Sequence, residues 1–205
     1  MNLKILRFYL ILKLEEQAKK VHDGLRVAMR REVFIHASFL FTFFVFIHLV
    51  KRWFSLSFYP LWLGGILGTI LPDIDHLLYI YFTKPDEPES KKARELIKQK
   101  KLKAALMLLL EGRRERRDLI FHTAFFQLIF LILTFLVITS SGSIFGRGLV
   151  LGFGLHLLVD QLLDILEKGD LNGWFTGLNF QLNKDKTTLY WAGNAIALLI
   201  FSFLL

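Results

Sequence analysis

The sequence predicts an all-α, polytopic membrane protein that forms a single domain over residues 1–205. Hydrophobic residues make up 54% of the chain, whereas an ordinary soluble domain has about 45–50%. These residues are gathered into runs of the length that a helix needs to cross a bilayer. The chain has no cysteine, which excludes a secreted scaffold stabilised by disulfides. We therefore expect about five transmembrane helices and additional cytoplasmic interfacial helices.

The first predicted element is a cytoplasmic amphipathic helix over residues 1–32. Its apolar stretch, residues 3–14, is too short to span a bilayer and is interrupted by Lys4, Arg7 and Lys13. No small-residue cleavage site follows, as a signal peptide would require. We expect this helix to lie in the membrane interface with its basic side toward anionic lipid headgroups.

Five runs of 18 to 24 residues are predicted to be transmembrane helices. They are residues 33–50, 59–82, 119–140, 149–166 and 188–205. The second run contains Pro72, which cannot continue the helical hydrogen bonding, so we expect a kink or a break there. Its glycines, Gly64, Gly65 and Gly68, offer a small face on which a neighbouring helix can pack closely.

Residues 83–118 form a basic cytoplasmic segment with twelve Lys and Arg residues. Ser90, after two prolines, is the predicted N-cap of a helix, and Gly112 is its predicted stop. One interpretation is a second helix in the membrane interface. A solvated cytoplasmic hairpin explains the segment equally well.

The distribution of Lys and Arg predicts the orientation in the membrane. Residues 1–32, 83–118 and 167–187 share one side and hold 23 of these residues, whereas the opposite side holds only Lys51, Arg52 and Arg147. The positive-inside rule makes the rich side cytoplasmic, with a cytoplasmic N-terminus in the cell (inner) membrane. Because the net charge of +8 lies in these flanking segments, we assign it to lipid headgroups and expect no nucleic-acid partner.

Seven Asp and His residues lie within the predicted spans, where each buried Asp is unfavourable by about 2.5–3.5 kcal/mol. They are His36, Asp73, Asp75, His76, His122, His156 and Asp160. The predicted topology brings all of them to the cytoplasmic half of the membrane. A scatter of independent polar residues would not produce this common depth.

The local spacing of these residues is typical of metal ligands. His156 and Asp160 are four residues apart and share a helix face, and Asp73 and His76 are three apart. Imidazole and carboxylate ligands without thiolate suit zinc, manganese or iron. Seven candidate ligands are too many for one tetrahedral ion, so we expect a divalent metal centre of one or two ions. Asp75 is a candidate ligand or general base.

The alternative is an interhelical hydrogen-bond network that only fixes the packing. Such a network of Asp and His would lack the Lys or Arg that usually neutralises buried carboxylates, whereas a metal ion would supply the positive charge. His48, at the outer end of the first span, is predicted to be a packing residue.

Several motifs together resemble those of the YdjM-like family of LexA-regulated, membrane-bound, predicted metal-dependent hydrolases. The strongest are Leu71-Pro72-Asp73-Ile74-Asp75-His76 and the later His156-x-x-x-Asp160, supported by an early His in the first span and by His122-Thr123 before the third. The resemblance covers about residues 33–165. It implies an all-helical inner-membrane protein with a metal site and hydrolase activity.

One motif departs from the family pattern. The family often has His-Arg-Gly-x-Thr-His-Ser before the third span, whereas this chain has Arg117-Asp118-Leu119-Ile120-Phe121-His122-Thr123. The second His is present and the first is absent. One ligand or substrate contact of the family is therefore missing here.

These observations predict a membrane-embedded hydrolase for a phosphoester or phospholipid at the cytoplasmic leaflet, because two metals can bind the attacking and leaving oxygens. Peptide or amide hydrolysis stays open, although the His-Glu-x-x-His signature is absent. The alternatives are a metal-ion carrier or sensor and a structural membrane protein. Residues 169–186, which contain Trp174, Phe175 and Phe180, either cap the site or form an ordinary loop.

Overall fold

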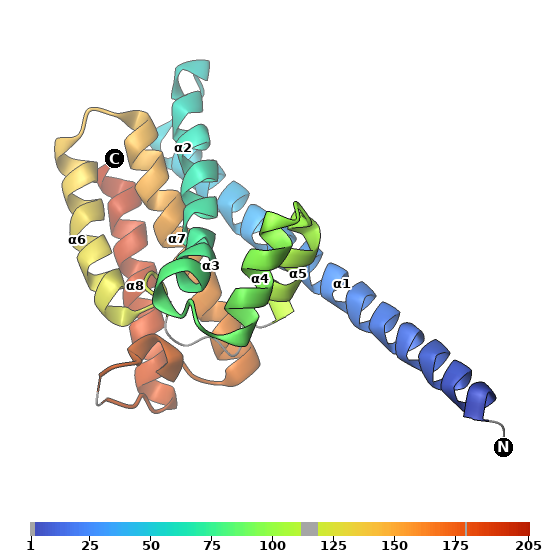
Figure 1. The fold of residues 1–205 in the computed structure, drawn as a ribbon. Helices are drawn as coiled ribbons and strands as arrows, with labels where there is room; N and C mark the ends of the chain where they lie inside the picture. Colours follow the sequence, from blue (N-terminus) through green and yellow to red (C-terminus); the bar gives the residue numbers. More distant parts are fainter. Residues whose placement is uncertain (1–2, 112–118, 179) are drawn as a thin grey trace.

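The computed structural model describes residues 3–111, 119–178 and 180–205, and in this part of the chain all regular structure is helical (Figure 1). The predicted all-α class is therefore confirmed for these residues. The α-helices are α1 (Leu3–Lys51), α2 (Tyr59–Ile70), α3 (Asp75–Leu78), α4 (Pro88–Lys98), α5 (Leu102–Glu111), α6 (Ala124–Ser140), α7 (Ile144–Lys168) and α8 (Lys184–Leu204). Short 3₁₀ segments are η1 (Leu56–Phe58), η2 (Leu71–Ile74) and η5 (Asn172–Phe175), and η3 (Tyr79–Thr83) is π-helical.

Four helical segments of the described chain are long and apolar enough to cross a membrane. They are Arg26–Lys51, Leu56–Thr83, Ile144–Lys168 and Lys184–Leu204. The third predicted span, residues 119–140, corresponds to α6, which has 17 residues and a length of about 26 Å, less than the ~30 Å of a typical bilayer core. It is short because Thr123 caps its N-terminus, with the side chain accepting a hydrogen bond from the Phe126 N–H at 3.2 Å.

Helix α1 joins the predicted interfacial helix and the first predicted span into one element of 49 residues. Its N-terminal half extends away from the bundle, and its C-terminal half packs beside α2 and α7 (Figure 1). At its C-terminal end the Lys51 ammonium donates hydrogen bonds to the backbone oxygens of Phe203 and Leu205, at 2.8 and 2.9 Å. The end of α1 therefore meets the end of α8.

The predicted break at Pro72 is confirmed. Helix α2 ends at Ile70, and the chain continues as the 3₁₀ turn η2, the single turn α3 and the π-helical η3. This irregular backbone carries Asp73, Asp75 and His76, so the break decides where their side chains lie.

Helices α2 and α7 pack in direct backbone contact through their glycines. A Cβ on Gly68 would lie 2.1 Å from the Leu149 carbonyl oxygen, and a Cβ on Gly152 would lie 2.2 Å from that of Gly65. Only glycine permits this approach. Because residue numbers rise in the same direction along both helices, α2 and α7 run parallel, as the predicted topology requires.

Helices α6, α7 and α8 share a buried polar network at their centre. The Gln161 side-chain amide and the Tyr190 hydroxyl both donate to the Gln127 side-chain oxygen, and the Asn194 amide donates to the Gln161 oxygen. Around it lies the apolar core, which includes Phe130, Leu151, Leu157, Leu198 and Phe201. The network satisfies buried polar groups without any charge.

The basic segment forms the hairpin of α4 and α5, and the predicted N-cap at Ser90 was wrong. Helix α4 begins at Pro88, since proline has no N–H and is favoured in the first turn, and Ser90 is buried inside the helix. The predicted single helix is interrupted at Lys100, which has a φ of 56°. Gly112 and Arg117 lie outside the described residues.

Candidate metal centre

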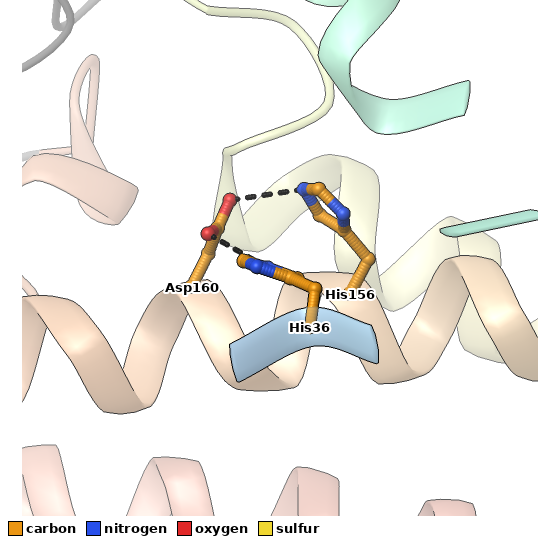
Figure 2. A group of neighbouring side chains, drawn as sticks. All are labelled: His36, His156 and Asp160. Atoms are coloured by element: carbon orange, nitrogen blue, oxygen red, sulfur yellow. Dashed lines mark ion pairs between the residues drawn. The ribbon is translucent and has the colours of Figure 1, made fainter. Parts of the chain in front are cut away.

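Three of the predicted ligands form a compact buried group (Figure 2). His156 and Asp160 lie one turn apart on α7, and His36 reaches them from α1. One ligand atom from each residue lies within 4.8 Å of the others, and the residues are only 8%, 3% and 4% exposed for His36, His156 and Asp160. We refer to these three residues as the metal group, because their atoms could hold an ion.

The hydrogen bond of His36 to its own helix determines its tautomer. The Nδ1 atom lies 2.9 Å from the Glu32 carbonyl oxygen, which can only accept, so Nδ1 carries the proton. In a neutral ring Nε2 is then a lone pair, and it lies 3.3 Å from Asp160 Oδ1. A lone pair facing a carboxylate oxygen is unfavourable unless the ring is protonated or a cation lies between them. The contact fixes the ring orientation whether or not an ion is bound, and His48 makes the same kind of contact with Phe44.

The surroundings of His156 also leave room for a cation or a proton between imidazole and carboxylate. Its Nε2 lies 3.2 Å from Asp160 Oδ2, yet neither ring nitrogen makes a hydrogen bond within the part of the chain that the structure describes. Buried polar atoms are rarely left this way. A ring nitrogen in this position could bind an ion held jointly with His36 and Asp160.

His122 connects the metal group to a second buried carboxylate. Its Nε2 lies 3.0 Å from Asp160 Oδ2 and its Nδ1 lies 3.1 Å from Asp75 Oδ2. A neutral imidazole has one N–H, so it can donate to only one of the two carboxylates. Asp160 therefore has three imidazoles at 3.0 to 3.3 Å, and either protonated rings or a bound cation would balance this arrangement.

The carboxylate of Asp75 is held by the segment before α6. It is 1% exposed and accepts hydrogen bonds from the N–H groups of Ile120 (2.9 Å) and Phe121 (2.6 Å) as well as its contact with His122. His122 therefore lies between Asp75 and Asp160 of the metal group, and the contact with Asp75 orients the His122 ring. Its predicted role as a ligand or general base stays a prediction.

The other two predicted ligands lie at the edge of the cluster. Asp73 has a side chain that is 54% exposed, and its Oδ1 is 3.9 Å from His156 Nε2. His76 is buried, with its ring centre 6.2 Å from that of His122. All seven predicted residues thus lie in one connected region, and the tightest group that could hold an ion among the described residues has three of them.

A cavity of about 650 Å³ borders this region. Asp160 and His122 line it, together with Glu32, Asp164 and Trp174. The Trp174 indole donates to Asp164 Oδ2 at 2.9 Å, and its ring centre lies 5.5 Å from that of His122. The segment after α7, predicted to be a cap or an ordinary loop, therefore forms a wall of the cavity beside His122.

The sequence interpretation did not include Glu32 and Asp164. The signal that points to them is spacing by four residues. Asp164 follows Asp160 as Asp160 follows His156, and Glu32 precedes His36 by one turn. Two acidic residues thus extend the faces that carry the metal group.

His48 lies apart from this region. Its Nδ1 contacts the Phe44 carbonyl oxygen at 2.9 Å, and its ring packs beside Trp53, Phe58 and Trp62. This is the environment of a packing residue, as predicted.

Comparisons of the chain with protein-family models, with curated proteins and with solved structures found no match.

Proposed function

We propose that the chain is a membrane-embedded, metal-dependent hydrolase that cleaves a phosphoester, such as a phospholipid, at the cytoplasmic leaflet. The observation that carries the proposal is the cavity of about 650 Å³ that reaches Asp160 and His122. Structural metal sites are closed by protein ligands, whereas catalytic sites keep a position open for water or substrate. A group of three buried ligands, of which Asp160 lines a cavity of ligand size, fits the catalytic pattern.

The metal group would hold one divalent ion, and His122 is the nearest further donor. The ligand set suits zinc, manganese or iron. A bound ion would supply the chemistry of a Lewis acid, which activates water and polarises a phosphoryl oxygen. In the overall reaction the water oxygen bonds to phosphorus, the ester P–O bond breaks, and the alcohol leaves with one proton. A second ion would need Asp73 or His76 as ligands.

The chain's own groups would orient the site. Asp75 holds the His122 ring through Nδ1, which directs Nε2 toward Asp160. Trp174 covers one side of His122 and is itself fixed by Asp164. These contacts would keep the imidazole in one orientation and limit the access of bulk water.

For the membrane, we propose five spans with a cytoplasmic N-terminus, α6 being the short third span. The Lys and Arg distribution supports this orientation. The parallel packing of α2 and α7 and the meeting of Lys51 with the end of α8 agree with it. The metal group and the cavity would then lie near the cytoplasmic surface, within reach of lipid headgroups. The basic α4–α5 hairpin would attract anionic lipids.

A metal-ion carrier is the second candidate, because the cavity wall contains several carboxylates that could lead a cation to the metal group. A carrier must also open toward the opposite side of the membrane. We rank the carrier second because carrier sites lie near the membrane midplane, whereas the proposed topology puts the metal group near the cytoplasmic surface.

Metal analysis of the purified protein tests the proposal, followed by assays of phosphoester and phospholipid hydrolysis. We expect His156→Ala and Asp160→Ala to lose the metal and the activity while still inserting into the membrane. His48→Ala is the matched control, since it removes an imidazole that lies outside the cluster and should keep its metal. A metal-free wild-type protein, or full occupancy in both α7 variants, would refute the site.

The assays also separate the three functions. Metal-dependent flux through proteoliposomes without hydrolysis would indicate a carrier. Reduced stability without any change in metal content would indicate that the cluster only packs helices.

A further inference from the structure

We infer that the cavity binds the ammonium group of a zwitterionic phosphoester, so that the substrate class carries a cationic group next to the phosphate. The inference rests on the proposed function for the phosphate end of the substrate. Its own content is the recognition of the cation, which a binding measurement can test without hydrolysis.

The charge of the cavity wall is the first observation. Among the described residues that line the cavity, five are carboxylates and one is a lysine. The carboxylates are Glu32, Asp160, Asp164, Glu167 and Asp170. These carboxylates attract a substrate whose phosphate is accompanied by a positive group.

Cationic side chains of the protein pair with carboxylates of this wall. Asp164 pairs with Lys168 at 2.8 Å, and Glu167 pairs with Arg31 at 2.7 Å. The side chain of Glu167 is 30% exposed and Arg31 is 56% exposed, so water screens this pair. Asp170 accepts a hydrogen bond from the Asn172 N–H through Oδ1, which holds its carboxylate in place.

The aromatic rings of the same wall are the second observation. Trp174, Phe175 and Phe180 line the cavity, and the ring centres of Phe175 and Phe180 are 5.8 Å apart. The Lys186 ammonium lies 5.1 Å from the Phe180 ring centre, so the protein already places one ammonium on this aromatic surface. Aromatic faces combined with carboxylates are the usual recognition elements for quaternary ammonium ligands.

The metal group gives an independent indication of a ligand, since its Asp160 lines the cavity. His156 is 3% exposed and has two ring nitrogens without hydrogen bonds among the described residues, and its Nε2 lies 3.2 Å from Asp160 Oδ2. This part of the cavity suits a metal ion with a phosphate oxygen. The aromatic wall lies close to His122, since the ring centres of Trp174 and His122 are 5.5 Å apart. A phosphate and an ammonium joined by a short linker therefore match two features of one cavity, the Asp160 and His122 side chains and the aromatic wall with its carboxylates.

Binding of soluble headgroup analogues tests the inference. The probes are phosphocholine, phosphoethanolamine and glycerol 3-phosphate, measured by calorimetry on the full chain in neutral detergent, both metal-loaded and chelator-treated. All three are phosphate monoesters, and only the first two carry an ammonium. We expect the two zwitterionic probes to bind the metal-loaded protein about tenfold more tightly than glycerol 3-phosphate, and to keep a measurable preference after chelation.

Variants identify the wall as the source of this preference. Glu167→Gln combined with Asp170→Asn keeps the side-chain shapes and should weaken phosphocholine binding by about threefold to tenfold. Phe180→Leu, at a position that is 47% exposed, should act in the same direction. Asp86→Asn is the matched control, since it removes one charge from a side chain that is 94% exposed and outside the cavity. Unchanged metal content in each variant would show that the metal group is intact.

The outcomes separate the two proposals. Equal affinity for phosphocholine and glycerol 3-phosphate, or variants that leave the preference unchanged, would overturn the inference whether or not the protein hydrolyses phosphoesters. Retained preference without hydrolysis would support the inference and refute only the hydrolase. Nanodiscs of phosphatidylcholine, phosphatidylethanolamine or phosphatidylglycerol distinguish a lipid from a soluble source, because a lipid substrate should bind from the first two and not from the third.

Discussion

Asp75→Asn tests whether a buried carboxylate sets the affinity of the metal group without belonging to it. The change keeps the shape of the side chain and removes its charge. In the wild-type protein both carboxylate oxygens accept hydrogen bonds from backbone N–H groups, and one of them also contacts His122. The least disruptive orientation of the new amide keeps its oxygen on the Phe121 N–H and His122, and turns its NH₂ group toward the Ile120 N–H.

The magnitude follows from this geometry. One buried donor faces another, which destabilises the fold by about 1–3 kcal/mol. For a chain of this length that corresponds to a melting temperature lower by about 2–12 °C. His122 also loses its charged partner, and such losses weaken metal binding by about 10- to 100-fold.

Thermal melting of the detergent-purified protein across a metal titration is the assay. At a free metal concentration 100 times the wild-type Kd, binding stabilises the wild type by about 2.7 kcal/mol, a rise of about 5–11 °C. In Asp75→Asn the same concentration should contribute about 0.4–1.4 kcal/mol, a rise of about 1–6 °C. Asp86→Asn serves as the control and should melt like the wild type with and without metal. An Asp75→Asn variant with a full wild-type metal shift would refute the role of Asp75 in orienting His122.

Three further predictions concern the fold and the membrane. Gly152→Ala places a Cβ 2.2 Å from a backbone oxygen of α2 and should destabilise the protein by about 1–3 kcal/mol, measured by thermal melting. Gly154→Ala is the control, because its Cβ meets only a Leu198 methyl group at 3.3 Å, and it should have a smaller effect. Equal losses of stability in the two variants would contradict the packing argument. Gln127→Leu leaves the Tyr190 hydroxyl and the Gln161 amide without their acceptor and should lower stability by about 1–3 kcal/mol with unchanged metal content, measured by melting and metal analysis. Labels at residues 86–118 should react only from the cytoplasmic side and labels near Lys51 only from outside, and the reverse pattern would invert the topology.

Much of the architecture could be predicted because it depends on local properties of the chain. Hydropathy and helix length indicate which segments can span a membrane, and Pro72 breaks its helix wherever that helix packs. His156 and Asp160 share a face because four residues make about one helical turn. The count of spans depends on more than hydropathy, since the capping of α6 by Thr123 requires a preceding segment that does not continue the helix.

The composition of the metal group depended on contacts between elements that are distant in sequence. His36 reaches Asp160 only because α1 packs beside α7, and glycine contacts bring α2 and its broken end against the same helix. Asp73 and Asp75 are two residues apart, yet their environments differ. Asp75 is buried and accepts hydrogen bonds from N–H groups of the segment before α6, whereas the Asp73 side chain is exposed.

The sequence by itself therefore determined the helical class, the break at Pro72 and the set of polar residues near one end of the bundle. Only the tertiary structure decided which of them approach within reach of one ion, and that Glu32, Asp164 and Trp174 border the cavity beside them. The physical reason is that spacing within a helix follows from backbone geometry, whereas distances between helices follow from how their side chains pack.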